Sequence, residues 1–244
     1  MKQYEAVIKV MEDNGGFATL GNLYQNVLKI KNCEWKTKTP FASMRRIVQD
    51  DRFFFKIKPG LWALKSYRSK LPFDVYPRNE INKVEKARLD HSYYQGLLVE
   101  IGNLRNFKTF IPYQDKNKKY LGRNLGDIIT IKKFYEFSYD SIVKKAQTID
   151  VGWFNLRKMP EYFFEVEYST NFQDKLLKFN ELQDFNSEFF IIADSIRKKE
   201  FEDKISLSAF KEIMKRVNFM DFTSLSEWHS NEYKISSIRR DYNL

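Results

Sequence analysis

The stretch TIDVGWFNLRKMPEYFFEVEYSTNFQDKLLKF, residues 148–179, predicts two neighbouring β-strands followed by a helix. Glu165 and Glu167 lie two residues apart in the second strand, so strand geometry places both carboxylates on one face. The opposite face carries Phe164, Val166 and Tyr168. Burying two like charges side by side is strongly unfavourable, so this edge requires a cation, a metal ion or solvent.

The composition favours a polyanionic partner. A formal net charge of +10 and a pI near 9.4 attract phosphates and repel basic surfaces. Cys33 is the sole cysteine, which excludes a disulfide framework and a thiolate zinc site and fits a reducing cytoplasm. The sequence has neither an apolar run long enough for a membrane span nor a signal peptide's apolar core.

The stretch 148–179 resembles the active site of the PD-(D/E)xK nuclease superfamily, because an Asp is followed by a hairpin and then by Glu-x-Glu. The residues concerned are Asp150, Glu165 and Glu167. The resemblance implies that Asp150 and Glu165 hold a divalent cation. The third position is usually Lys and orients or deprotonates the attacking water; Glu167 departs from this pattern, as in a minority of restriction enzymes. With Ser169-Thr170 and the run FFIIAD, residues about 90–201 also resemble a group of endonuclease-like bacterial proteins.

The residue types agree with hydrolysis of a phosphodiester, which requires an in-line water, charge neutralisation on the phosphoryl oxygens and help for the leaving oxygen. Mg²⁺ suits the site because hard carboxylate oxygens dominate. We therefore expect Asp150 and Glu165 to be metal ligands and Glu167 to act on the water. Lys175 or Lys178 in the following helix is a candidate for the cation that Glu167 does not supply.

The run HSYYQGLLVEIG predicts that a helix over 91–102 opens this second domain. The superfamily resemblance implies that an acidic residue or Gln from this helix joins the metal site. Gln95 and Glu100 are the candidates, but they lie on different sides of the apolar stripe, so we expect one of them to reach it. His91 is a weaker candidate, because a lone histidine is more often a cap or a surface residue.

Residues 1–65 predict three helices and a hairpin. Apolar residues at helical spacing mark helices over 4–11, 20–28 and from Pro40, and RFFFKIK, Pro59-Gly60 and LWALK predict the hairpin. This order is that of a winged helix, whose third helix enters the major groove. The run TPFASMRRIVQDDRFFFKIKPGLWAL resembles HARE-type helix-turn-helix domains. The candidates for DNA contact are Lys36, Lys38, Ser43, Arg45, Arg46 and Gln49.

The expected organisation is a winged-helix DNA-binding domain over 1–66, a polar linker over 67–90 and a nuclease-like domain with a C-terminal extension over 91–244. Within the linker, the run KVEKARL is suited to a short helix. The fold class is mixed α+β, with a central mixed sheet flanked by helices in the second domain. The run 188–194, EFFIIAD, is suited to a central parallel strand. A helix is expected over 209–217, and three uses are open to the tail: covering the core, contacting DNA, or forming a homodimer.

Two function classes remain open. The favoured one is a Mg²⁺-dependent endonuclease of restriction type, acting on double-stranded DNA with or without a requirement for a modified base. The alternative is a non-catalytic DNA-binding regulator that retains the nuclease fold as a scaffold. An RNA substrate is less compatible with a winged helix.

Overall fold

The computed structural model describes residues 1–77, 80–168 and 171–241 and divides the chain into two compact units. The first unit combines Met1–Ile81 with Ser226–Leu244, and the second spans Asn82–Leu225. Ser169 and Thr170, which belong to the pattern that resembles the endonuclease-like proteins, lie outside the described residues.

The first unit contains short helices and a three-stranded antiparallel sheet of order β1-β3-β2. In chain order its elements before the second unit are α1 (Gln3–Asp13), β1 (Phe17–Thr19), α2 (Leu20–Asn26), α3 (Pro40–Ile47), β2 (Phe54–Lys58) and β3 (Leu61–Leu64). The three helices and the β2–β3 hairpin confirm the sequence prediction for these elements. The short β1 was not predicted; it pairs with β3 and so joins the helices to the hairpin.

The last helix, α9 (Phe222–Asp241), contributes its residues from Ser226 onward to the first unit. The Ser226 hydroxyl donates to the Pro59 carbonyl at 3.0 Å. A methyl group on Gly21 of α2 would come within 2.4 Å of the Tyr233 ring, so the glycine permits close packing of α2 against α9. This grouping differs from the expected domain over 91–244, because contacts distant in sequence recruit the end of the chain to the first unit.

The second unit is built on a five-stranded mixed sheet of order β10-β9-β8-β7-β4. Strands β10, β9 and β8 run parallel, and β7 and β4 pair antiparallel. Its strands in this sheet are β4 (Lys108–Phe110), β7 (Val151–Phe154), β8 (Pro160–Glu167), β9 (Glu188–Ala193) and β10 (Val217–Asp221). The predicted parallel strand β9 is confirmed as an interior strand, and the chain has the expected mixed α+β fold.

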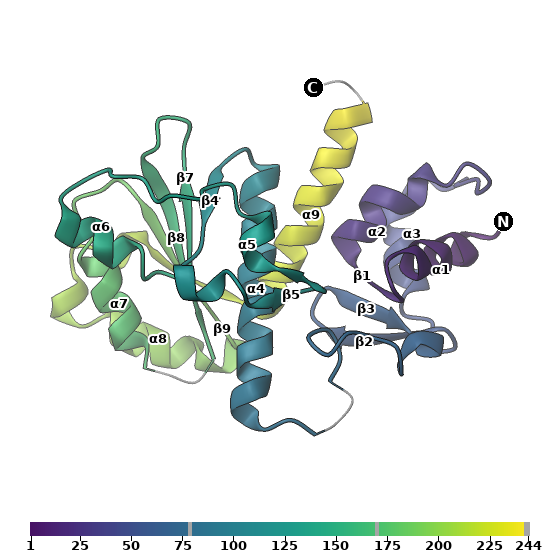
Figure 1. The fold of residues 1–244 in the computed structure, drawn as a ribbon, viewed down its shortest axis with the longest axis horizontal. Coiled ribbons are helices and arrows are strands. Elements are labelled where there is room, and N and C mark those ends of the chain that lie inside the picture. Colours follow the sequence, from purple (N-terminus) through teal and green to yellow (C-terminus); the bar gives the residue numbers. More distant parts are fainter. Residues whose placement is uncertain (78–79, 169–170, 242–244) are drawn as a thin grey trace. The chain divides into compact units, whose positions relative to one another are not determined.

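Helices cover both faces of this sheet, as Figure 1 shows. The helices of the unit are α4 (Lys83–Leu104), α5 (Leu125–Ile128), α6 (Asp140–Ala146), α7 (Phe172–Asn180) and α8 (Lys198–Ile205). Phenylalanines on one face of the sheet pack with apolar residues of α6, α7 and α8 in a single core. Helix α4 packs on the opposite face, where its glycine Gly102 lies directly against the Trp153 ring.

Three segments of the second unit differ from the sequence prediction. The short helix expected at KVEKARL and the helix expected over 91–102 form one continuous helix, α4, which starts at Lys83; Asn82 caps it by accepting from the Glu85 N–H at 2.8 Å. The expected loop 115–124 contains a small hairpin of β5 (Lys119–Tyr120) and β6 (Arg123–Asn124).

The predicted helix over 209–217 is wrong. The buried Phe210 ends one short 3₁₀ turn, Ser208–Phe210, and the buried Ile213 directly precedes a second, Met214–Arg216. Val217 then pairs with Phe189 as the start of β10. Arg216 holds this conformation by donating to the Phe185 and Ser187 carbonyls, so tertiary contacts override the local helical pattern.

Among the helices of the described ranges, none is long and apolar enough to cross a membrane.

Candidate active site

Three carboxylates lie at one end of the β7–β8 pair. Val151 of β7 is opposite Phe164 of β8, and the antiparallel register places Asp150, one residue earlier, beside Glu165, one residue later. The Val166 N–H donates to Asp150 Oδ2 at 2.8 Å and fixes this arrangement. Asp150 is 8% exposed and Glu165 is fully buried, so both charges need compensation inside the protein.

Two lysines of α7 provide this compensation for Glu165. Lys175 Nζ lies 2.8 Å from Glu165 Oε2, and Lys178 Nζ donates to Oε1 at 2.7 Å. Because the lysines are three residues apart, they occupy the same face of the helix. Lys178 also donates to the Thr148 carbonyl at 3.0 Å, which ties the helix to the segment before β7. The structure therefore brings both sequence candidates for a cation to the same carboxylate.

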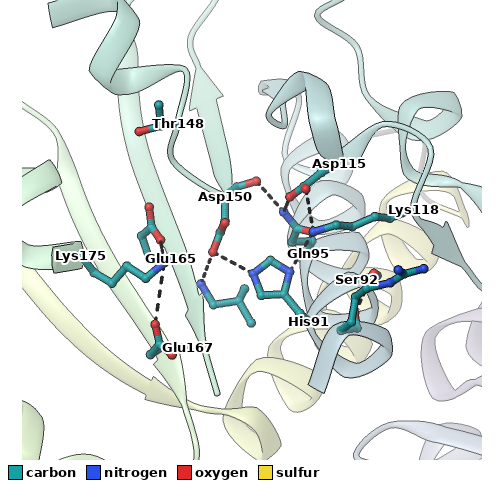
Figure 2. Close-up of polar contacts among 12 residues, drawn as sticks. His91, Ser92, Gln95, Asp115, Lys118, Thr148, Asp150, Glu165, Glu167 and Lys175 are labelled. Carbon is teal, nitrogen blue, oxygen red and sulfur yellow. Dashed lines mark hydrogen bonds and ion pairs between the residues drawn. The ribbon is translucent and has the colours of Figure 1, made fainter. Parts of the chain in front are cut away.

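Glu167 is buried at the end of β8 between two cations. Its Oε2 lies 3.8 Å from Lys175 Nζ, and its Oε1 lies 3.7 Å from Arg197 Nη1 (Figure 2 shows the lysine contact). The Arg197 guanidinium stacks on the Phe172 ring at 4.1 Å. Sequence reasoning missed Arg197, although it follows the parallel strand β9, whose carboxyl end lies at the same sheet edge as that of β8.

On its other side, Asp150 contacts two residues of α4, as Figure 2 shows. His91 Nε2 lies 3.1 Å from Asp150 Oδ2, and Gln95 Nε2 donates to the Asp150 carbonyl at 3.1 Å. Gln95 also donates to Asp115 Oδ2 at 2.7 Å. The structure thus places Gln95 and the more weakly favoured His91 at the site, together with Asp115, which lies in a segment that the sequence marked only as a loop.

Glu100 lies away from this cluster. It accepts a hydrogen bond from the Tyr120 hydroxyl at 3.0 Å and pairs with Arg123 of the small hairpin. Gln95 and Glu100 are five residues apart on α4 and project in different directions, so of these two candidates only Gln95 reaches Asp150.

The electrostatics of Asp150 and His91 are linked. Burial alone would raise the pKa of Asp150, but the positive charge of His91 and the Val166 N–H hold it well below its ordinary value. Burial acts to lower the pKa of His91, but the charge and hydrogen bond of the Asp150 carboxylate have the larger effect. The pKa of His91 is therefore raised above its ordinary value. The two residues therefore form an ion pair when the imidazole is protonated.

Glu165 has the opposite tendency. Burial and the neighbouring Asp150 charge raise the pKa of Glu165 to about 7, against the lowering effect of Lys175 and Lys178. Burial opposes the charged form of Lys175, but Glu165 and Asp150 dominate and raise the pKa of the ammonium group. A carboxyl group with a strongly raised pKa beside two ammonium groups is a candidate functional residue.

The DNA-contact candidates lie in the first unit, on and around α3. Ser43, Arg45 and Arg46 are on the helix; Ser43 is half-buried and its hydroxyl donates to the Thr39 carbonyl at 3.4 Å. The other three candidates, Lys36, Lys38 and Gln49, flank the helix. Every candidate side chain except that of Ser43 is exposed. The helix therefore presents its two arginines to solvent.

Comparison with known proteins gives the family. Residues 71–242 match the family model described as the C-terminal domain of the type II restriction enzyme NmeDI. The chain belongs to this NmeDI C-terminal domain family. It is also 27% identical over 179 residues to the type II restriction enzyme NmeDI of Neisseria meningitidis serogroup C, covering 69% of this chain and 47% of that protein. The chain thus spans about half the length of this relative, and no solved structure matches it.

The NmeDI family match includes the whole carboxylate cluster and leaves residues 1–70 outside it. Within the described residues there is no group of three or more His, Cys, Asp or Glu side chains placed to hold a metal ion. Asp150 and Glu165 nevertheless offer adjacent hard oxygen donors, and Mg²⁺ commonly binds through one or two carboxylates plus water and substrate phosphate. Asp150 and Glu165 are therefore the residues that could hold a hard divalent cation such as Mg²⁺.

Proposed function

We propose that this chain is a Mg²⁺-dependent restriction endonuclease that hydrolyses phosphodiester bonds in double-stranded DNA. The observation that carries the proposal is the convergence of Asp150 and Glu165 at one sheet end with the lysines of α7. The NmeDI family relationship supports restriction chemistry at this site. The order of strand Asp and strand Glu-x-Glu supports a PD-(D/E)xK type of active site.

Each residue has a role in this proposal. Asp150 and Glu165 would hold Mg²⁺, and the bound ion would supply charge neutralisation on the phosphoryl oxygens. Glu167 orients the attacking water or accepts its proton. Lys175, which lies between Glu165 and Glu167, provides the positive charge that a lysine at position 167 would give. Gln95 fixes the backbone of Asp150.

The first unit supplies DNA binding in this proposal. Its three helices and antiparallel hairpin have the element order of a winged helix, in which the third helix lies in the major groove. The exposed Arg45 and Arg46 of α3 can then reach phosphates or base edges. Whether cleavage requires a modified base depends on readout by this unit or by the nuclease-like unit.

Plasmid cleavage tests the proposal. Wild-type protein is expected to cut methylated or unmethylated plasmid with Mg²⁺ and to leave it intact with EDTA. Asp150→Ala should abolish cutting while retaining DNA binding in a gel shift, because it removes a metal ligand. Asp184→Ala, at an exposed acid of the same unit, should cut at the wild-type rate. Wild-type protein that shifts both plasmids yet cuts neither would instead indicate the DNA-binding regulator.

A further inference from the structure

We infer that Asp115 is a positioning residue that orients Asp150 through Gln95 and His91. This inference rests on the proposed function, because it concerns the carboxylate that would hold the metal ion. Asp115 ends the 3₁₀ turn Tyr113–Asp115, 35 residues before Asp150 in sequence. It is 3% exposed, so its carboxylate faces the protein interior.

The hydrogen bonds determine how the Gln95 side chain is turned. Its Nε2 lies 2.7 Å from Asp115 Oδ2 and 3.1 Å from the Asp150 carbonyl oxygen, and both partners are acceptors. Only the amide NH₂ group can donate to both, whereas the reverse orientation would place Oε1 against a carboxylate and a carbonyl. Asp115 therefore fixes the amide with Oε1 directed away from it.

The fixed amide in turn orients His91. Gln95 Oε1 lies 3.1 Å from His91 Nδ1, so this ring nitrogen must donate. The opposite nitrogen, Nε2, lies 3.1 Å from Asp150 Oδ2. The chain of contacts runs from Asp115 through Gln95 and His91 to the carboxylate, and a second branch from Gln95 holds the Asp150 backbone (Figure 2).

Lys118 balances the charge at the remote end of this network. Its Nζ lies 2.6 Å from Asp115 Oδ1, while Oδ2 remains directed at Gln95. The ion pair explains how a buried carboxylate is tolerated there, but it does not require the contact with Gln95. Orientation of Gln95 is thus a separate property of Asp115, and it can be tested apart from charge compensation.

Loss of the Asp115 acceptor should weaken metal binding. Without it the Gln95 amide can rotate, and both the Asp150 backbone and His91 lose a fixed partner. Residues that orient metal ligands typically change metal affinity by about 10–100-fold when they are removed. DNA binding by the exposed surface of α3 should be unaffected, because that helix belongs to the other unit.

The experiment measures Mn²⁺ binding to the full chain by isothermal titration calorimetry. Mn²⁺ is the probe because it also prefers oxygen ligands. Asp115→Leu should raise the dissociation constant about 10–100-fold, and Asp115→Asn should restore most of the affinity because its side-chain oxygen can still accept from Gln95. Lys119→Met, at an exposed lysine of the same segment, is the control and should bind Mn²⁺ as wild type does.

Gln95→Met provides the second variant, and it carries the same test if Asp115→Leu does not fold. Because both substitutions break one network, the double variant should lose no more affinity than the single ones. Folded Asp115→Leu or Gln95→Met protein with wild-type Mn²⁺ affinity would overturn the inference while leaving the metal site intact. Wild-type protein that binds no Mn²⁺ would instead overturn the proposed function, and the inference with it.

Discussion

At the scale of single residues, His91 shows how the environment defines a role that residue type does not. Gln95 Oε1 and Asp150 Oδ2 are both acceptors at 3.1 Å, one at each ring nitrogen. An imidazolium can donate to both, whereas a neutral ring can donate to only one. Both contacts favour the imidazolium form, in the same direction as the raised pKa of His91.

This pairing predicts a pH dependence of stability. The pKa of His91 is higher in the folded protein than its ordinary value of 6.5, so its stabilising effect is fully present below pH 6.5 and is lost as pH rises through the folded value. Denaturant unfolding of wild type and His91→Gln at pH 6 and pH 9 measures this effect. The stability difference between them should be larger at pH 6, and an equal difference at both pH values would contradict the ion pair.

The sequence identified part of the site residue by residue. Asp150, Glu165 and Glu167 stood out because carboxylates interrupt apolar strands, and Gln95 followed from the helix that opens the unit. Asp115 could not be found in this way. It lies in a segment rich in lysines with no periodic pattern, and its contact with Gln95 depends on tertiary folding.

At the scale of elements, α7 acts as a cation-bearing helix over the end of β8. Glu165 and Glu167 are two residues apart in a strand, and Lys175 and Lys178 are three residues apart in a helix. The sequence alone could therefore place each pair on one face of its element. Their mutual contact follows from the connection, because a helix after β8 packs back on the sheet it leaves. The helix over 209–217 was predicted incorrectly because the three-residue spacing of its apolar residues also suits short 3₁₀ turns.

Substitution of the α7 lysines should separate their roles. Lys175→Met is expected to lower the cleavage rate by about 100-fold or more, because this lysine contacts Glu165 and approaches Glu167. Lys178→Met should have a smaller effect, since it contacts Glu165 alone among the carboxylates. Single-turnover cleavage measures both, with the exposed Lys211→Met as a control and a melting curve for each variant. Wild-type rates for both would remove the lysines from the mechanism.

At the scale of the whole molecule, our proposal assigns DNA binding to the first unit and the chemistry to the second. The family match begins at residue 71, shortly before the second unit starts at Asn82, so the proposed groove-binding helix α3 lies outside the matched region. The sequence predicted two domains and the elements of each. It did not predict that residues from Ser226 onward group with the first unit, because that depends on the packing of α9 against Gly21.

This division predicts that DNA affinity and cleavage chemistry can be altered independently. Arg45→Ala/Arg46→Ala should weaken DNA binding, and the slope of log affinity against log salt should fall by about one for each lost phosphate contact. Fluorescence anisotropy over a salt series measures the slope, and Lys9→Ala, at an exposed lysine on α1, is the control. An unchanged affinity and slope in the double variant would exclude α3 as the binding helix.

The most direct test of the account is a crystal structure of the chain with a DNA duplex and Ca²⁺. We expect an ion bound by oxygens of both Asp150 and Glu165, at the roughly 2.3–2.6 Å typical of calcium, next to a phosphate. At least one lysine should then have left its present position on Glu165. An ion bound elsewhere on the DNA complex, with Lys175 and Lys178 still paired to Glu165, would contradict the metal site on which the proposed activity depends.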